Sequence, residues 1–415
     1  MSGKDKDDAA TRKAAYDAEL PQITFDTVED ALRLTTPVNP ATVIFTGGQP
    51  GSGKSQAIVE KAVVEYADKG GIAVLDPDEL RPLFAQARRE QAAGEYSPQG
   101  YEAAGTLAYN VSLQLAAEQR NILRDGSLRD AEWPMKEIGE LKRHDYQVEI
   151  HIAAVHRDVS HARTEQRRQL DAAVSDVGFG RKVDRSFHDQ AAAGVVQTAG
   201  QLWDMPDVNR FVVYDANGSV VLDRSRDDRG EWVDKDTGKP HAGPAPSTII
   251  EERQTQATAA DLVMTADAWR RARESLDGRA APASELEIAV LDRNLNGALD
   301  AVRGNAEASA HASQDEYVKL RALLLQRESE PLRAQAEAWK RDGQEARNNW
   351  PTYAPAFDKA DELVRKNEDL ARAAGRIVDG DKLRQSVADK IAGVRERTAE
   401  PGRAAAKPRH DEQER

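Results

Sequence analysis

The sequence predicts an α/β fold, a parallel sheet covered by helices on both faces, followed by a mainly α-helical C-terminal region. Short apolar, β-branched runs alternate with helical patterns through the first half of the chain. Such alternation is typical of a parallel sheet that lies between two layers of helices. A glycine-rich turn directly follows the first apolar run. Beyond about residue 240 the sequence becomes rich in Ala, Leu, Glu, Arg and Gln at helical spacing.

The expected strands are short. Their length and β-branched content predict buried strands at three places, 42–46, 72–75 and 147–155. A hairpin should follow, with strands at 211–215 and 219–222. Its turn, Ala216-Asn217-Gly218, contains the Asn-Gly pair that type I′ turns favour.

The two ends of the chain differ from this α/β core. The first forty positions are polar, and 27–35 fits a short helix that ends before Pro37. A helical region is expected from about 247 to 391, broken near Gly278 and at Trp350-Pro351. Its apolar side chains predict a bundle core: Trp269, Leu320, Leu323, Leu324, Leu325, Trp339 and Trp350. The tail at 401–415 lacks an apolar face and is expected to be disordered.

Composition and charge exclude several classes of protein. The chain of 415 residues has 0 cysteines, which excludes disulfides and zinc–cysteine sites, so any metal must be held by oxygen or imidazole. A formal net charge of -13 argues against a general nucleic-acid binder. The charged first residues do not resemble a signal peptide, and no apolar run approaches the ~20 residues of a membrane span. We therefore expect a soluble, cytoplasmic protein that binds neither nucleic acid nor membrane.

The turn after the first strand carries the clearest chemical motif. It reads Gly-Gln-Pro-Gly-Ser-Gly-Lys-Ser and fits G-x-x-x-x-G-K-[ST] without a mismatch. Glycines let backbone N–H groups converge on a phosphate, and the following helix points its positive end at the same anion. Lys54 should reach the β- and γ-phosphates, and the Ser55 hydroxyl should ligate Mg²⁺. The predicted nucleotide-binding residues are Gly48, Gln49, Pro50, Gly51, Ser52, Gly53, Lys54 and Ser55.

A phosphoryl-transfer enzyme also needs a carboxylate that orients the acceptor hydroxyl and takes its proton. Asp76 and Asp78 follow the strand at 72–75, at the carboxyl end where open α/β sheets bind their ligands. One of the two could instead cap the helix that begins near Glu79. The residue pattern leaves the choice between them open.

Several segments together resemble the zeta-toxin family, whose members are kinases of UDP-N-acetylglucosamine. The first three are Gly47–Ser55, then Asp-Pro-Asp-Glu-Leu-Arg at 76–81, then Asp-Gly-Ser-Leu-Arg at 125–129. Arg167 and Arg181 follow in the family's order. The resemblance covers about Val43 to Arg224. It implies a P-loop kinase fold.

The resemblance and the change in composition together define the expected domains. A polar N-terminal segment at 1–40 precedes a kinase domain at 41–240. A helical region at 241–400 and the disordered tail follow it.

The resemblance implies roles for particular residues. Lys54 falls on the family's phosphate-binding lysine, and Asp78 falls on its proposed base for the sugar hydroxyl. Arg167 and Arg181 fall on two arginines that face the nucleotide phosphates. Guanidinium groups suit that position because they stabilise the charge that spreads over a transferring phosphoryl group. Alternatively, Arg167 is one member of a solvated helix face that also contains Arg163 and Arg168.

The acceptor side resembles the family less closely. Asp125 and Ser127 stand where the family has Glu and Thr, so the polar groups remain on shorter side chains. With Asp78 and Arg129 they are the implied substrate-binding residues. Tyr109 stands where some members carry an acidic residue that touches the sugar. A changed pocket wall can admit a different acceptor.

The function that follows is a phosphotransferase, dependent on ATP or GTP and on Mg²⁺, that acts on a sugar-nucleotide hydroxyl as a toxin. UDP-N-acetylglucosamine is the first candidate acceptor. The first alternative is a P-loop kinase of another small acceptor, such as a nucleoside, a dinucleotide or another nucleotide sugar. The second is a nucleotide-hydrolysing switch that controls the helical region. That region is either a packed extension or a module for an antitoxin or a secretion partner, the latter allowing delivery to another cell.

Overall fold

The structure is a computed structural model that describes residues 3–93, 95, 97–174, 180–279, 282–317, 319–325 and 327. The chain divides into two compact units, Met1–Ala298 and Leu299–Arg415. The sheet and all predicted site residues belong to the first unit. No helix among the described residues is long and apolar enough to cross a membrane.

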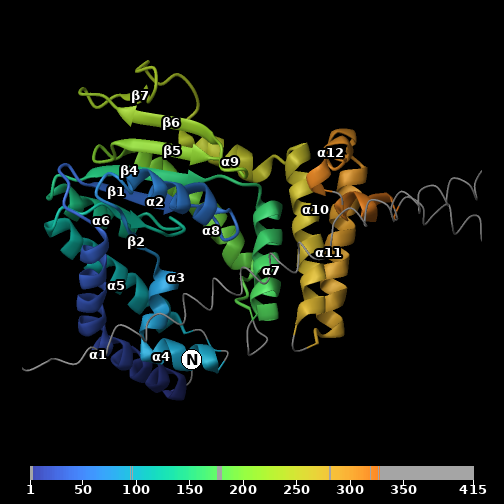
Figure 1. The fold of residues 1–415 in the computed structure, drawn as a ribbon, viewed down its shortest axis with the longest axis horizontal. Helices are drawn as coiled ribbons and strands as arrows, with labels where there is room; N and C mark the ends of the chain where they lie inside the picture. The colour runs from blue at the N-terminus through green and yellow to red at the C-terminus, as the bar shows by residue number, and fades with distance from the viewer. Residues whose placement is uncertain are drawn as a thin grey trace, which may run out of the picture. The chain divides into compact units, whose positions relative to one another are not determined.

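The first unit is built on a sheet of seven strands in the order β2-β3-β1-β4-β5-β6-β7 (Figure 1). The strands are β1 Thr42–Gly47, β2 Ala73–Leu75, β3 Ile122–Arg124, β4 Gln147–Ala153, β5 Arg210–Tyr214, β6 Val220–Arg226 and β7 Trp232–Asp234. Strands β1 to β5 pair in parallel, whereas β6 and β7 are antiparallel additions at one edge. Because β1 lies between β3 and β4, the loop after β1 leaves from the middle of the parallel part.

Helices cover both faces of the sheet, as expected. The helices of the first unit are α1 Gly3–Leu34, α2 Glu60–Tyr66, α3 Pro77–Leu80, α4 Ala85–Ala92, α5 Pro98–Ala117, α6 Glu132–Lys142, α7 Arg157–Val174, α8 Arg185–Asp204, α9 Pro246–Thr255 and α10 Ala259–Glu274. Val43 and Phe45 point into the larger core, which contains buried residues of α5, α6 and α8. Ile44 points the other way and packs with Ala62 and Tyr66 of α2. This alternation follows from the two-residue period of a strand.

The structure differs from the sequence-based expectation at several elements. Strands β3 and β7 were not among the expected strands, and each is three residues long. The short helix expected at 27–35 is part of the much longer α1, which begins at Gly3. Tyr16 anchors α1 because its ring packs at 5.3 Å from that of Phe84 and its hydroxyl donates to Glu90 at 2.9 Å. The polar residues of α1 therefore lie mainly on the side of the helix that faces solvent.

The region after the hairpin is helical as far as it is described. Helix α9 packs on α8 and β5, and α10 packs on α7. Helix α11 Glu285–Arg303 crosses the division between the units, and α12 Ala306–His311 belongs to the second. Trp269 and Leu320 are buried, as expected for core residues. Trp339, Trp350, the break at Trp350-Pro351 and the tail at 401–415 lie outside the described residues.

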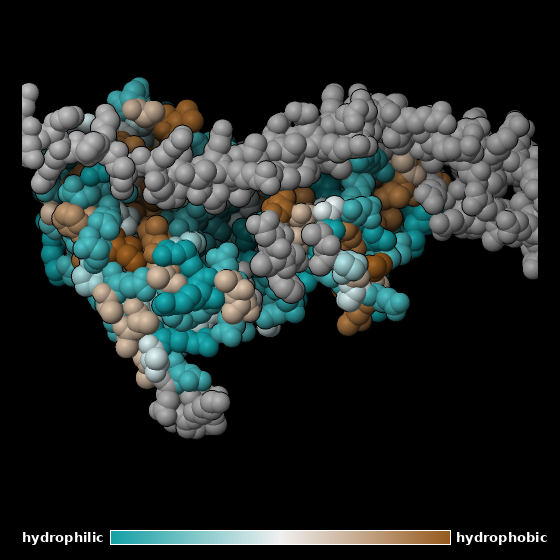
Figure 2. All heavy atoms as spheres, turned by 60° about the horizontal axis from the view of Figure 1, so that its bottom comes forward, coloured by the Kyte–Doolittle hydropathy of each residue, from teal (hydrophilic) through white to brown (hydrophobic). Residues whose placement is uncertain are grey.

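On the face drawn in Figure 2, hydrophobic and hydrophilic residues are interspersed over the described part of the chain. Exposed apolar side chains are found at separate places in the sequence, such as Phe25, Trp133 and Leu286. Single exposed apolar side chains of this kind are ordinary on a protein surface.

Candidate functional site

The phosphate-binding loop has the backbone that its glycines predict. Gly48 and Gly51 have φ values of 141° and 79°, which side chains with a Cβ rarely adopt. A Cβ on Gly51 would also lie 2.0 Å from the backbone oxygen of Ser160 on α7. Glycine is therefore required at this position both for the turn and for the close approach of α7.

Lys54 lies among the charged side chains that the sequence singled out. Its Nζ donates to the backbone oxygen of Gly48 at 3.1 Å. Burial lowers the pKa of Lys54, and Asp125 and Asp76 oppose that shift. Arg167 and Asp78 also act on this lysine, Arg167 lowering and Asp78 raising the pKa. The structure thus brings together groups from the ends of β1, β2 and β3 and from α7.

The two carboxylates after β2 have different partners. Asp76 caps α3, because its Oδ1 accepts a hydrogen bond from the backbone N–H of Asp78 at 2.8 Å. Burial, followed by the charge of Asp125, raises the pKa of Asp76 to about 6. Asp78 is more exposed and forms an ion pair with Arg181. The cap is thus assigned to Asp76, and Asp78 keeps a side chain that is open to solvent.

Arg181 is placed by an aromatic ring as well as by Asp78. Its guanidinium lies 5.4 Å from the centroid of Tyr101, and that of Arg81 lies 4.8 Å from the same ring. Burial alone would lower the pKa of Arg181, but Asp78 and Tyr101 raise it overall. The sequence did not single out Tyr101. The feature that could have indicated it is an aromatic residue near the start of α5, the helix that packs on α3.

The loop after β3 runs beside the phosphate-binding loop. Asp125 accepts a hydrogen bond from the Thr46 hydroxyl. The backbone N–H of Gly48 donates to the backbone oxygen of Ser127 at 3.1 Å. Ser127 Oγ accepts from the backbone N–H of Arg129 at 3.3 Å. The guanidinium of Arg129 lies over the ring of Phe187 at 4.9 Å. The charge of Asp125 acts on Lys54, whereas Arg129 contacts α8.

Arg167 and Tyr109 occupy different surroundings. Arg167 is exposed on α7 and influences both Lys54 and Asp171, so it is near the site without a fixed partner among the described side chains. Tyr109 packs against Trp133 and under the ammonium of Lys136 at the start of α6.

A buried polar network supports the phosphate-binding loop. The Gln49 amide donates to the Val155 oxygen at 2.6 Å and to Ser160 Oγ at 3.1 Å. Ser160 Oγ is 2.9 Å from Nε2 of His188. The Gln254 amide of α9 donates to Gln49 Oε1 at 3.3 Å. Gln49 belongs to the predicted nucleotide-binding loop, and its buried side chain holds that loop in place.

The residues present are compatible with Mg²⁺ at this site. The described residues contain no group of three or more His, Cys, Asp or Glu that could hold a metal ion. Mg²⁺ usually keeps several waters and takes only one or two protein oxygens beside substrate phosphates. The exposed hydroxyl of Ser55 and the carboxylate of Asp125 supply such oxygens.

Comparisons with known proteins agree with this architecture. A model of the zeta toxin family matches residues 26–227. The toxin PezT of Streptococcus pneumoniae serotype 4 (strain ATCC BAA-334 / TIGR4) is 24% identical over 185 residues, which are 43% of this chain and 70% of PezT. A solved structure from the PezAT chromosomal toxin–antitoxin system of the human pathogen Streptococcus pneumoniae matches at a TM-score of 0.52 and 19% identity. It covers 63% of this chain and 97% of the other, and establishes the fold alone.

A more distant structure is the complex of AvrRxo1-ORF1 and AvrRxo1-ORF2 with ATP. It matches at a TM-score of 0.39 and 14% identity, over 68% of this chain and 88% of the other. That likeness is too low to carry an argument.

Proposed function

Residues 26–227 match the model of the zeta toxin family, and from this premise we propose that the protein is a P-loop kinase that transfers the γ-phosphoryl group of ATP or GTP to a small hydroxyl acceptor. A sugar nucleotide, with UDP-N-acetylglucosamine as the first candidate, is the proposed acceptor. The relatives also support a role as a toxin, because PezT is named as one.

The observation that carries the proposal is the set of charges around Lys54. Asp76, Asp78, Asp125 and Arg167 all influence this lysine, although they come from three separate segments of the chain. Their meeting place is the carboxyl end of the parallel strands, directly beside a glycine-rich loop that can bind phosphate. A carboxylate and an arginine at this position suit phosphoryl transfer, because the carboxylate can take a proton and the arginine can stabilise the charge of the phosphoryl group.

In the proposed reaction the acceptor hydroxyl oxygen attacks the γ-phosphorus while the bond to the β-phosphate oxygen breaks. Asp78 takes the hydroxyl proton, and the nucleoside diphosphate leaves with the electron pair of the broken bond. Lys54, Arg167 and Arg181 stabilise the charge on the phosphoryl oxygens. The ion pair with Arg181 orients the Asp78 carboxylate before the acceptor arrives.

The remaining residues of the site position the reactants. Ser127, Asp125 and Arg129 are proposed to hold the acceptor. Ser55 and Asp125 would hold Mg²⁺. A bound Mg²⁺ would neutralise part of the negative charge of the phosphates. An antitoxin partner is also proposed, because a structure of the same fold comes from a toxin–antitoxin system.

The test is phosphate transfer from labelled ATP by the purified protein, with UDP-N-acetylglucosamine offered alone and then among other nucleotides and sugars. We expect Lys54→Ala to abolish transfer and Asp78→Asn to lower turnover by about 10²–10⁴-fold. Glu79→Gln is the matched control, because Glu79 is an exposed neighbour on the same helix. Its turnover should equal that of the wild type.

Each other outcome has a distinct meaning. Transfer to a different acceptor would keep the kinase and discard the proposed substrate. Hydrolysis that needs no acceptor would favour the nucleotide-hydrolysing switch. Full activity of Lys54→Ala would refute the proposed reaction.

A further inference from the structure

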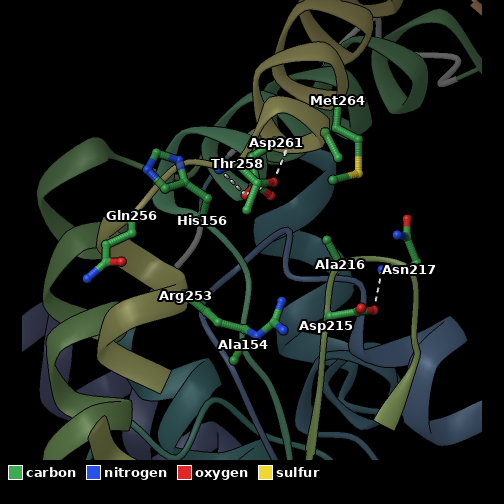
Figure 3. Close-up of a pocket in the computed structure, with 11 residues that line it drawn as sticks. Ala154, His156, Asp215, Ala216, Asn217, Arg253, Gln256, Thr258, Asp261 and Met264 are labelled. Carbon is green, nitrogen blue, oxygen red and sulfur yellow. Dashed lines mark hydrogen bonds between the residues drawn. The ribbon is translucent and has the colours of Figure 1, made fainter. Parts of the chain in front are cut away.

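A pocket lies between the end of the sheet and the helices that follow the hairpin. Its cavity of about 190 Å³ is lined by Ala154 and Ala216 on the sheet side and by Arg253, Ala260 and Met264 on the helical side. Figure 3 shows Arg253 extending from α9 toward Ala154 and Asp215, with Met264 on α10 facing Ala216. All of these residues belong to the unit Met1–Ala298. The helical side lies beyond residue 227, where the family match ends.

This pocket adjoins the phosphate-binding loop. Arg163 of α7 lies between the pocket and the loop. On the pocket side, its Nη2 lies 3.5 Å from the backbone oxygen of Ala216 and 3.5 Å from the Met264 sulfur. On its other side, Arg163 Nη1 would lie 3.6 Å from a Cβ placed on Gly53. The turn at Gly218 also approaches the first helical turn after the loop, where a Cβ on Gly218 would lie 3.4 Å from the Cα of Ala57. A ligand with phosphates on the loop therefore has this pocket within its reach.

A second, independent contact joins the same helical segment to the loop. Gln254 of α9 and Gln49 of the loop are both fully buried, and their side chains are hydrogen-bonded at 3.3 Å. A buried amide that loses its partner is costly. Gln254 is thus a positioning residue for the loop, whereas Arg253, one position earlier, faces the pocket.

The chemistry of the pocket suits one flat heterocycle. Its cavity is smaller than the roughly 300–1,000 Å³ of sites for whole drug-sized ligands. Alanine and methionine side chains offer apolar walls for a ring. Among the described residues the guanidinium of Arg253 has no hydrogen-bond or ion-pair partner. Such a group can stack on an aromatic ring or donate to its nitrogen acceptors.

We propose that this pocket takes the purine base of the donor nucleotide, and that residues 246–264 complete the donor site by lining it and by holding Gln49. The proposal rests on the proposed function, since the phosphates must sit on the loop. It assigns base binding in part to a segment outside the family match. The helical extension is then a working part of the kinase.

The test compares ligands with and without a base on the full chain. Dissociation constants for ATP, GTP and inorganic tripolyphosphate are measured by calorimetry with Mg²⁺ present. We expect Arg253→Ala to weaken ATP or GTP binding about tenfold while leaving tripolyphosphate unchanged. Ala260→Trp, which fills the pocket, should act in the same direction. Arg293→Ala is the control, because Arg293 is an exposed arginine on α11 away from the pocket lining.

Gln254→Met separates the two contributions of the segment. It should weaken tripolyphosphate and the nucleotides by the same factor, because it acts on the loop and leaves the base pocket intact. Equal nucleotide binding by the wild type, Arg253→Ala and Ala260→Trp would overturn the proposal while the proposed function stands. A wild type that binds neither tripolyphosphate nor nucleotide would overturn both.

Discussion

Asp76 occupies a position that favours its hydrogen bond and disfavours its charge. The carboxylate caps α3 through the backbone N–H of Asp78 at 2.8 Å. Burial, followed by repulsion from Asp125, raises its pKa to about 6. In the unfolded chain the pKa should be near 3.9. The folded protein therefore binds this proton more tightly than the unfolded chain does.

The sign of the resulting pH dependence can be tested with Asp76→Asn, since asparagine caps a helix as well as aspartate does. Below pH ~4 the carboxyl group is protonated in both states of the wild type, so the variant should have the same stability. Between pH ~4 and about 6, the unfolded chain ionises at Asp76 while the folded protein still holds the proton, so the wild type loses stability that the amide retains. Urea unfolding at pH 4, 6 and 8 should show an advantage of the variant that grows mainly from pH 4 to pH 6 and then levels off. An advantage of the variant that is the same at each pH would contradict the raised pKa of Asp76 in the folded protein.

At the scale of elements, the end of β3 is tied to α6 by an ion pair that is almost fully buried. Arg124 donates to Glu137 at 2.7 Å, and their side chains are 12% and 4% exposed. Arg124 also donates to the backbone oxygen of Leu75 at 3.3 Å, at the end of β2. An arginine at a buried strand end is thereby satisfied by two neighbouring elements.

Breaking this pair from one side should be costly. Glu137→Ala leaves a buried guanidinium without its counter-charge, and we expect a loss of about 3–5 kcal/mol in the free energy of unfolding. The double variant Arg124→Met with Glu137→Met should recover most of that loss, because no uncompensated charge remains. Glu140→Ala, which removes the exposed pair with Arg143 on the same helix, should cost less than ~1 kcal/mol. If Glu137→Ala cost no more than Glu140→Ala, the pair would have no structural role.

These elements also show what a sequence can and cannot predict. The phosphate-binding loop and β1 were predictable, because a β-branched run, four glycines and a lysine are adjacent in the chain. Strand β3 was not, because three residues are too few to show a period. Which of the two carboxylates, Asp76 or Asp78, caps α3 could not be read from the sequence and needed the geometry of the helix start. The Gln49–Gln254 contact joins residues 205 positions apart, and no local pattern reports it.

At the scale of the whole molecule, the helical region after the hairpin is not uniform. Its first part, α9 and α10, packs on α8, β5 and α7 within the same unit as the residues of the proposed site. Ile250, Val263 and Trp269 are buried in that packing. The second unit begins at Leu299, near the end of α11. A packed extension and a separate module can therefore be distinguished by where the chain is cut.

Two truncations test this division. A chain that ends at Gly243 lacks α9 and α10, so the buried faces of α7 and α8 are exposed to water and Gln49 loses its partner on α9. We expect it to lose phosphate transfer and tripolyphosphate binding together. A chain that ends at Gly304 keeps every residue of the proposed site, so its turnover should be close to that of the full chain. Turnover by the shorter chain at the full rate would mean that residues 244–304 are a partner module after all, because a module that does not support the loop can be removed without affecting catalysis.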